Sequence, residues 1–178
     1  MSLSLYIGPM FAGKSTAALG IIQRNKFIGK ATLCITSHLD TRSSNAIKTH
    51  DNEIHPARSV SNLMPLLQCP EFLSAKAVII EEAQFFTDLK VFVLSAVEQF
   101  KKDVIVVGLD GDSNRKPFGQ ILELIPYCDS VQKLTAVCTK CENGVRAIFT
   151  SRKVSTDSQV LVGAADLYEP LCRRHYCQ

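Results

Sequence analysis

The sequence predicts an α/β fold: a mainly parallel sheet covered by helices on both faces, followed by a small metal-binding module. Three observations support this prediction. Short apolar runs alternate with helical segments up to residue 137, a glycine-rich loop directly follows the first run, and four of the seven cysteines lie after residue 137. Continuous β-branched runs separated by helices are typical of parallel strands buried on both faces. We therefore expect an α/β domain over residues 1–137 and a small module over residues 138–178.

The individual elements follow from hydrophobic periodicity. Strands are expected over residues 3–7, 31–36, 76–80 and 104–109, with a further candidate over 131–137. Helices are expected over residues 16–27 and 89–100, and Ser61 is expected to cap a short helix that runs to residue 68. Residues 37–56 are polar and predict a long loop. The face shared by the helix over 89–100 consists of Leu89, Phe92, Val93, Ala96 and Phe100.

Length and composition restrict the class of protein. The chain has 178 residues, of which 46% are hydrophobic, enough for a core of ordinary size. The net charge is +3, from 20 basic and 17 acidic residues, which argues against a nucleic-acid or membrane partner. We find no apolar stretch as long as a membrane span and expect no secretory signal, because the first apolar run already leads into the glycine loop. We therefore expect a cytoplasmic protein whose cysteines are metal ligands or buried thiols.

A glycine-rich loop follows the first predicted strand. Its sequence has the spacing G-x-x-x-x-G-K-S, and it leads into the first predicted helix. A phosphate-binding loop needs this context, because glycines let successive backbone N–H groups turn toward one phosphate. A glycine turn with a chance lysine is the alternative, and the complete motif after a strand argues against it. The residues are Gly8, Pro9, Met10, Phe11, Ala12, Gly13, Lys14 and Ser15.

Each polar residue of this loop has an expected role. Lys14 carries a positive charge to the β- and γ-phosphates, and the Ser15 hydroxyl can ligate Mg²⁺. The helix that starts near Thr16 adds the positive end of its dipole. The loop therefore predicts binding of ATP together with Mg²⁺.

Two carboxylates follow the apolar strand over residues 76–80. Glu81 and Glu82 occupy the position at which phosphate-loop enzymes place an acid near Mg²⁺, and the neighbouring acid can reach the nucleophile. Successive side chains at a strand end point in different directions, so the two acids can divide these roles. The alternative is an ordinary charged turn. Phe85 and Phe86 follow, and two aromatic rings beside a catalytic edge can flank a planar ligand; the alternative for one of the two is core packing.

The carboxyl-terminal module carries two metal-binding pairs. Cys138 and Cys141 form C-x-x-C, and Cys172 and His175 form C-x-x-H. Together they predict a tetrahedral zinc site with a closed ligand set, and hence a structural rather than a catalytic role. The alternatives are unrelated buried thiols, or a competing ligand at Cys177.

The other cysteines, Cys34, Cys69 and Cys128, are interpreted as core thiols. Between the two pairs, residues 160–168 combine a glycine with small residues. A tight turn is the simpler interpretation of that segment, and close approach of the backbone to a ligand is the alternative.

Several motifs together resemble type II thymidine kinases, and the resemblance covers nearly the whole chain. The motifs are GPMFAGKST from residue 8, DTR at 40–42, THD at 49–51, EEAQFF at 81–86, LDG at 109–111, RKPF at 115–118, KLTAVCTKC at 133–141, GAADLY at 163–168 and LCRRHY at 171–176. The resemblance implies a RecA-like domain with a phosphate-binding loop, a zinc-binding subdomain, and a lasso loop over the nucleoside. It also implies transfer of the ATP γ-phosphate to the 5′-hydroxyl of thymidine or deoxyuridine, with dTTP as feedback inhibitor and a homotetrameric assembly.

The resemblance also implies roles for individual residues. Glu82 matches the catalytic base, and Glu81 stands where the family usually has aspartate. Arg42, beside Asp40, matches an arginine that contacts phosphate. The thymine pocket corresponds to Met10, Phe85, Leu109 and Phe118, and the lasso to Thr150, Leu161, Gly163 and Tyr168. The zinc ligands correspond to Cys138, Cys141, Cys172 and His175, where His175 replaces the commoner cysteine.

Two other classes of function share some of these features. A nucleic-acid-dependent ATPase can combine a phosphate-loop core with a zinc ribbon, but it needs a basic, aromatic-rich face. The balanced charge and the lack of tryptophan argue against that class. A nucleotide-binding regulator without catalysis is the third hypothesis, and the paired carboxylates count against it.

Overall fold

The computed structural model describes residues 1–40, 45–48, 53–141, 143–154 and 166–178. Its centre is a six-stranded sheet in which every neighbouring pair of strands is parallel. The strand order is β5-β2-β6-β7-β1-β8. The bounds are β1 Ser2–Ile7, β2 Thr32–Ser37, β5 Arg58–Val60, β6 Ala77–Ile80, β7 Asp103–Gly108 and β8 Ser130–Lys133. The predicted α/β class and its mainly parallel sheet are confirmed.

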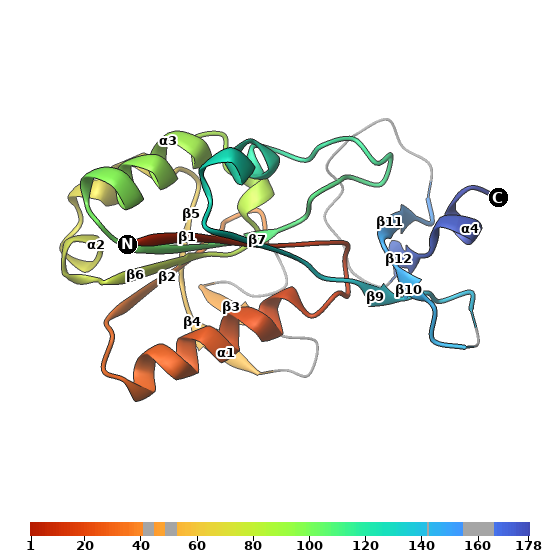
Figure 1. Cartoon of the computed structure of the whole chain (residues 1–178), viewed down its shortest axis with the longest axis horizontal. Coiled ribbons are helices and arrows are strands. Elements are labelled where there is room, and N and C mark those ends of the chain that lie inside the picture. The colour runs from red at the N-terminus through yellow and green to blue at the C-terminus, as the bar shows by residue number, and fades with distance from the viewer. Residues whose placement is uncertain (41–44, 49–52, 142, 155–165) are drawn as a thin grey trace.

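Helices cover both faces of this sheet (Figure 1). Helix α1, Lys14–Phe27, lies on one face, and α2, Pro70–Ser74, and α3, Leu89–Leu94, lie on the other. A π-helical turn, η3, continues α3 over Ser95–Gln99, so the predicted helix over 89–100 is confirmed. Three 3₁₀ segments complete this layer: η1 Met64–Gln68, η2 Ala83–Phe85 and η4 Ile121–Tyr127. Among the described residues, no helix has the length and apolar character needed to cross a bilayer.

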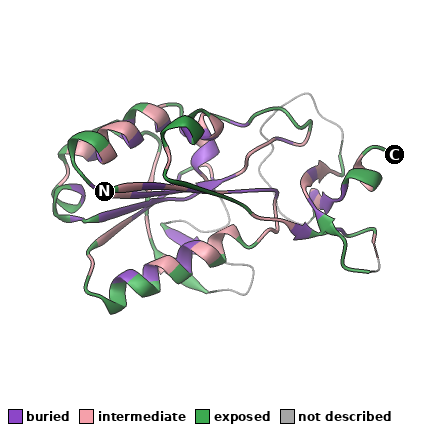
Figure 2. Cartoon of the chain, viewed as in Figure 1, coloured by how far each residue is buried: buried purple, intermediate pink, exposed green. Residues whose placement is uncertain are grey.

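The alternation of side chains along the strands divides the core into two layers. In β6, Val78 and Ile80 pack toward α3, whereas Ile79 packs toward α1. Figure 2 shows the central strands of the sheet as largely buried, and β6 is buried at all four of its positions. The α3 layer includes Leu3, Leu5, Ile7, Phe72, Phe86, Leu89 and Phe92, and the α1 layer includes Ala18, Leu19, Ile22, Cys34, Ile105 and Val107.

The sequence predicts a long loop over residues 37–56, and this prediction is only partly right. The segment contains β3, Ala46–Lys48, and β4, Ile54–Pro56, which pair as an antiparallel hairpin. The physical reason is Ile47, whose side chain is fully buried against α1 in the core. One apolar anchor in a polar stretch carries too little periodicity to reveal a strand.

The prediction that Ser61 caps a short helix is wrong. The segment is the 3₁₀ helix η1, and its N-cap position, Leu63, makes no side-chain cap. The Asp88 carboxylate accepts hydrogen bonds from the backbone N–H groups of Leu63 and Met64, at 2.8 and 2.9 Å. Asp88, at the start of α3, therefore caps η1 in place of Ser61.

The predicted strand over 131–137 is divided between two sheets. β8 ends at Lys133, and the chain then leaves the sheet for β9, Ala136–Val137, which pairs with β10, Arg146–Ala147. Strands β11, Phe149–Arg152, and β12, Tyr168–Leu171, form a second antiparallel pair, and α4, Arg173–Tyr176, ends the module. The division at residue 137 stays a prediction, although β9 already pairs within the small module.

Candidate active site and metal centre

The carboxyl ends of β1, β6 and β7 bring the predicted site residues to one edge of the sheet. Because the strands are parallel, the segments that follow Ile7, Ile80 and Gly108 leave on the same side. The small module lies beyond this same edge (Figure 1). The fold thus gathers the glycine loop, the acidic pair and the module that carries the cysteines.

The glycine loop begins where β1 passes close to the chain after β8. A Cβ atom at Gly8 would lie 2.4 Å from the carbonyl oxygen of Leu134, and the φ angle of Gly8 is +149°. A larger residue therefore does not fit there. Phe11, with φ of 64°, is one of few non-glycine residues with positive φ. The Lys14 amino group donates a hydrogen bond to the Pro9 carbonyl at 2.7 Å, so the lysine side chain folds back over the loop.

Helix α1 begins directly after this loop. Its N-cap is Gly13, which makes no side-chain cap. The first N–H groups of a helix have no partner within the helix and carry the positive end of its dipole. Lys14, Ser15 and Thr16 form this first turn. The predicted ATP-binding residues 8–16 therefore lie in one continuous loop and helix start, whereas Arg42 lies outside the described residues.

The predicted magnesium ligands contact each other. The Ser15 hydroxyl donates a hydrogen bond to Oε1 of Glu81. Glu81 is only 2% exposed, and its backbone N–H donates to the carbonyl of Ile35 at 2.9 Å. A hydroxyl and a buried carboxylate form the hard oxygen set that Mg²⁺ prefers. Glutamate in place of aspartate therefore still reaches the serine, and these two residues fit the ion.

Glu82 leaves the strand with an unusual backbone. Its φ and ψ angles are 51° and 39°, in the left-handed region. Such a conformation is costly for a residue with a Cβ atom, and it is concentrated at functional sites. The turn separates the two acids, because Glu81 is buried against Ser15 whereas Glu82 is half-buried and receives a hydrogen bond from the Gln84 amide at 2.5 Å.

The residues predicted to surround the base of a nucleoside come from three places. Phe85 and Phe118 pack edge to face, with ring centroids 5.6 Å apart. The backbone N–H of Leu109 donates to Gln84 Oε1 at 3.0 Å, which places β7 against the same turn. Met10 donates its backbone N–H to Thr150 Oγ1 at 3.0 Å, so the glycine loop contacts β11.

The remaining residues of the predicted lasso are only partly described. Tyr168 is buried at the start of β12, where Arg152 lies over its ring at 5.5 Å. Leu161 and Gly163 lie outside the described residues. The described residues therefore show the Phe85–Phe118 pair and the contact of the glycine loop with β11, and they leave the predicted lasso contacts as predictions.

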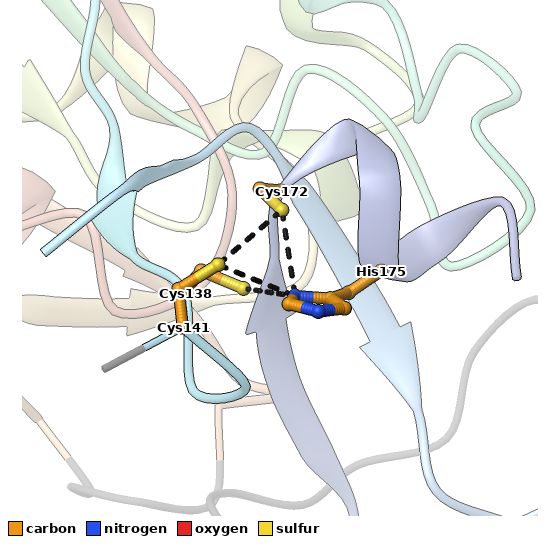
Figure 3. A group of neighbouring side chains, drawn as sticks. All are labelled: Cys138, Cys141, Cys172 and His175. Atoms are coloured by element: carbon orange, nitrogen blue, oxygen red, sulfur yellow. Dashed lines mark hydrogen bonds between the residues drawn. The ribbon is translucent and has the colours of Figure 1, made fainter. Parts of the chain in front are cut away.

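The four predicted zinc ligands converge in the small module (Figure 3). Their ligand atoms all lie within 4.8 Å of one another. The His175 Nδ1 atom is 3.5, 3.3 and 3.6 Å from the sulfurs of Cys138, Cys141 and Cys172, and the sulfurs of Cys141 and Cys172 are 3.8 Å apart. Ligands in a tetrahedral zinc site lie about 3.6 Å apart for nitrogen and sulfur and about 3.8 Å for two sulfurs, from the usual bond lengths. The side chains therefore fit zinc.

The electrostatics of the cluster also favour a metal. Burial opposes ionisation of Cys138, but hydrogen bonds from the Cys172 backbone, His175 and the Lys140 backbone outweigh it and lower the pKa of that thiol to about 6. Burial, with the neighbouring Cys138 and Cys172 thiols, raises the pKa of Cys141 to about 11. The lowered pKa favours the thiolate form of Cys138, which is the form that binds a metal, whereas Cys141 has to lose its proton before it can serve as a ligand.

The remaining cysteines lie elsewhere. Cys177 is exposed, and its sulfur lies 3.8 Å from a guanidinium nitrogen of Arg115 rather than in the ligand group. Cys34 is a buried core thiol, and burial followed by the charge of Glu81 raises its pKa to about 12. Cys69 and Cys128 are only half-buried at the border of the core, so the prediction of core thiols is confirmed in full for Cys34 alone.

The small module also contacts the loop that follows β7. The Tyr176 hydroxyl, one residue beyond the zinc ligand His175, donates to the Ser113 carbonyl at 2.5 Å. The Arg115 guanidinium lies over the rings of Tyr176 and Phe149, at 4.9 and 5.6 Å. The loop that leads to Phe118 is therefore anchored on the element that holds the metal ligands.

Comparison with known proteins shows the family to which the chain belongs. A family model described as thymidine kinase matches residues 1–176. The chain belongs to the thymidine kinase family. It is 40% identical to a thymidine kinase of Oryza sativa subsp. japonica over 98% of this chain and 65% of that protein. The identity is 38% with the cytosolic thymidine kinase of Homo sapiens, over 98% of this chain and 72% of that protein, and 35% with the thymidine kinase of Variola virus, over 98% and 96%. Thymidine kinases are ATP-dependent kinases.

Several residues at the site carried no clear signal in the sequence. Gln84 stands inside an aromatic motif, and only its burial and its two amide contacts mark it as part of the site. Arg115 and Tyr176 belong to the motifs RKPF and LCRRHY, but neither motif indicates that the two residues contact each other, because that contact depends on how the two modules meet. A polar residue in an otherwise apolar run, as in Ala83-Gln84-Phe85, is the one signal that could have revealed Gln84.

Proposed function

We propose that this protein transfers the γ-phosphoryl group of ATP to the 5′-hydroxyl of thymidine, and of deoxyuridine, to give the nucleoside monophosphate. The observation that carries the proposal is the meeting of the glycine loop, the Ser15–Glu81 pair and Glu82 at one edge of the sheet. Phosphoryl transfer needs positioned phosphates, a metal and an oriented hydroxyl, and these residue types supply all three. Membership of the thymidine kinase family supports thymidine as the acceptor.

The chain's own residues divide the work. The glycine loop and the first turn of α1 bind the phosphates through backbone N–H groups, and Lys14 adds its charge. Ser15 and Glu81 hold Mg²⁺, which neutralises charge on the phosphates when it is bound. Glu82 orients the 5′-hydroxyl and accepts its proton. Arg42 stabilises the transferring group in this proposal.

The acceptor is held by the other half of the site. Met10, Phe85, Leu109 and Phe118 surround the thymine, and the backbone around Leu161, Gly163 and Tyr168 reads the edge of the base. The edge-to-face pair of Phe85 and Phe118 supports this assignment, because aromatic walls suit a planar base. A structural zinc ion on the three cysteines and His175 keeps this module in place.

Three further properties belong to the same proposal. By its relation to the cytosolic human enzyme, the protein works in the cytoplasm. Inhibition by dTTP and a homotetrameric assembly follow from the family resemblance. No nucleic acid or membrane partner is proposed. Steady-state inhibition by dTTP, and molecular mass by light scattering, test the first two of these properties separately from catalysis.

Radiolabelled nucleosides test the central proposal. Incubation of the protein with Mg-ATP should convert thymidine and deoxyuridine to monophosphates and leave purine nucleosides unchanged. In the proposal, the aromatic walls and the backbone groups that bind the edge of the base select pyrimidines. ATP hydrolysis stimulated by DNA, without any thymidine monophosphate, would instead favour the nucleic-acid-dependent ATPase.

A further inference from the structure

The side-chain amide of Gln84 is fixed between the end of β7 and the acidic turn. Gln84 is 3% exposed. Its Oε1 accepts the backbone N–H of Leu109 at 3.0 Å, and its Nε2 donates to Oε2 of Glu82 at 2.5 Å. Because the Leu109 N–H can only donate, Oε1 must face it, and the NH₂ group must then face the carboxylate. The orientation of the amide is therefore determined by its partners.

Packing around the amide leaves it no second position. A Cβ atom at Gly108 would lie 2.5 Å from Oε1 of Gln84 and 2.6 Å from Cδ1 of Ile121. The backbone of β7 thus passes directly against the amide, and only glycine permits that approach. An amide that is buried, packed and bonded at both ends is a rigid support rather than a mobile surface group.

The amide of Gln84 supports the end of the Glu82 side chain. Its backbone is in the left-handed region at φ 51°, where the turn itself fixes the direction of Cβ but not the carboxylate at the end of the chain. The hydrogen bond from Gln84 supplies a constraint at that end. We propose that Gln84 is a positioning residue that holds the Glu82 carboxylate toward the acceptor hydroxyl.

This inference rests on the proposed function, in which Glu82 is the base. Gln84 does not contact substrate in this account and acts only through Glu82. Displacing a catalytic group by about 1 Å can cost roughly 100-fold in rate. Loss of the amide should therefore lower kcat by about 10- to 100-fold and leave the binding of both substrates nearly unchanged.

The variant Gln84→Glu separates the two hydrogen bonds. It keeps an oxygen for the Leu109 N–H and replaces the donor that faces Glu82. Gln120→Glu is the matched control: Gln120 Oε1 likewise accepts a backbone N–H, from Lys90 at 2.9 Å, and it takes no part in the proposed site. We expect a lowered kcat with an unchanged KM for thymidine in the first variant, and normal kinetics in the control.

A double-variant cycle with Glu82→Gln distinguishes the possible failures. If Glu82→Gln alone retains normal turnover, the proposed base is wrong. If Glu82→Gln loses turnover but Gln84→Glu retains it, Gln84 does not position the base. If Gln84→Glu lowers kcat equally with and without Glu82, it acts by another route, and the inference is overturned. Thymidine binding by calorimetry reports on the folded state. If Gln84→Glu does not fold, Gln84→Met replaces it in the cycle; because this variant also removes the acceptor of the Leu109 N–H, only the part of its effect that depends on Glu82 counts as positioning.

Discussion

Loss of one zinc ligand should unfold the small module while leaving the α/β domain folded. In the part of the module that the structure describes, the buried apolar cluster consists of five residues, Ala136, Cys138, Ala147, Leu171 and Cys172, and two of these are predicted zinc ligands. So small a cluster does not bury enough apolar surface to hold a module by itself. The α/β domain has its own two-layered core, which contains none of the four predicted zinc ligands, so we expect it to stay folded without the metal. Cys138→Ser should therefore separate the stabilities of the two parts.

The size of the effect follows from the loop that the metal closes. Cys141 and Cys172 are 31 positions apart in the sequence. A cross-link over a loop of that length removes about 3–4 kcal/mol of chain entropy from the unfolded state, and structural zinc contributes on the order of 10 kcal/mol in isolated zinc modules. Either figure exceeds what the remaining three buried residues can replace.

The consequence for the substrate can also be estimated. The module supplies the Met10–Thr150 hydrogen bond and the Tyr176–Ser113 hydrogen bond, at 3.0 and 2.5 Å. Both bonds order the pocket before thymidine binds. At about 1 kcal/mol each, their loss adds about 2 kcal/mol of ordering cost to binding, which predicts that thymidine binds more weakly by roughly 30-fold. Magnesium-ATP binding should change much less, because the glycine loop belongs to the α/β domain.

Three measurements test this prediction together: calorimetric unfolding, zinc content and thymidine binding. We expect about one zinc per chain in the wild-type protein, and in Cys138→Ser no zinc, an early transition for the module and a nearly unchanged main transition. Cys177→Ser is the control, because Cys177 is exposed and outside the ligand group, and it should behave as wild type. A metal-free wild-type protein with a single cooperative transition would refute the reasoning.

Three more perturbations test other parts of the account. Ser15→Ala removes the hydroxyl that meets Glu81, and it should weaken ATP binding by about 10-fold in the presence of Mg²⁺ but not in its absence, as calorimetry with and without chelator will show. Asp88→Ala leaves the Leu63 and Met64 N–H groups without their acceptor and should lower the free energy of unfolding by about 1–2 kcal/mol in urea, whereas Asp88→Asn, which keeps an oxygen, should lose less. Partial burial opposes ionisation of Asp103, but hydrogen bonds from Lys30 and Ser2 outweigh it and hold its pKa below the ordinary 3.8. That stabilisation is fully present above pH 3.8 and is lost as pH falls through the lower folded pKa, so Asp103→Asn should be less stable by about 1 kcal/mol at neutral pH and equal to wild type at the acid end.

The strands and the metal ligands could be predicted because their signals are local. The run Val78-Ile79-Ile80 is apolar enough to indicate a fully buried strand, and two short cysteine and histidine pairs indicate zinc by spacing alone. The structure places both as expected. In each case the residues whose pattern predicts the feature are also the residues that form it in the structure.

Features that depend on distant partners could not be predicted. Ile47 turns a polar segment into a hairpin only because α1 covers it, and Asp88 replaces Ser61 as a cap only because α3 begins beside η1. The sequence likewise gave no reason to connect Gln84 with Leu109, which is 25 positions away. Such contacts depend on how the sheet and its helices pack, and the hydrophobic periodicity of the sequence does not predict them.

A single-turnover measurement on Glu82→Gln tests the central claim most directly. Glutamine keeps the shape of the side chain and its place in the left-handed turn but cannot accept the proton of the 5′-hydroxyl. With thymidine binding measured in parallel, we predict that the variant binds thymidine and ATP as the wild-type protein does, while formation of thymidine monophosphate falls by about 100-fold or more. Phosphorylation at the wild-type rate by a variant that binds both substrates normally would contradict the account.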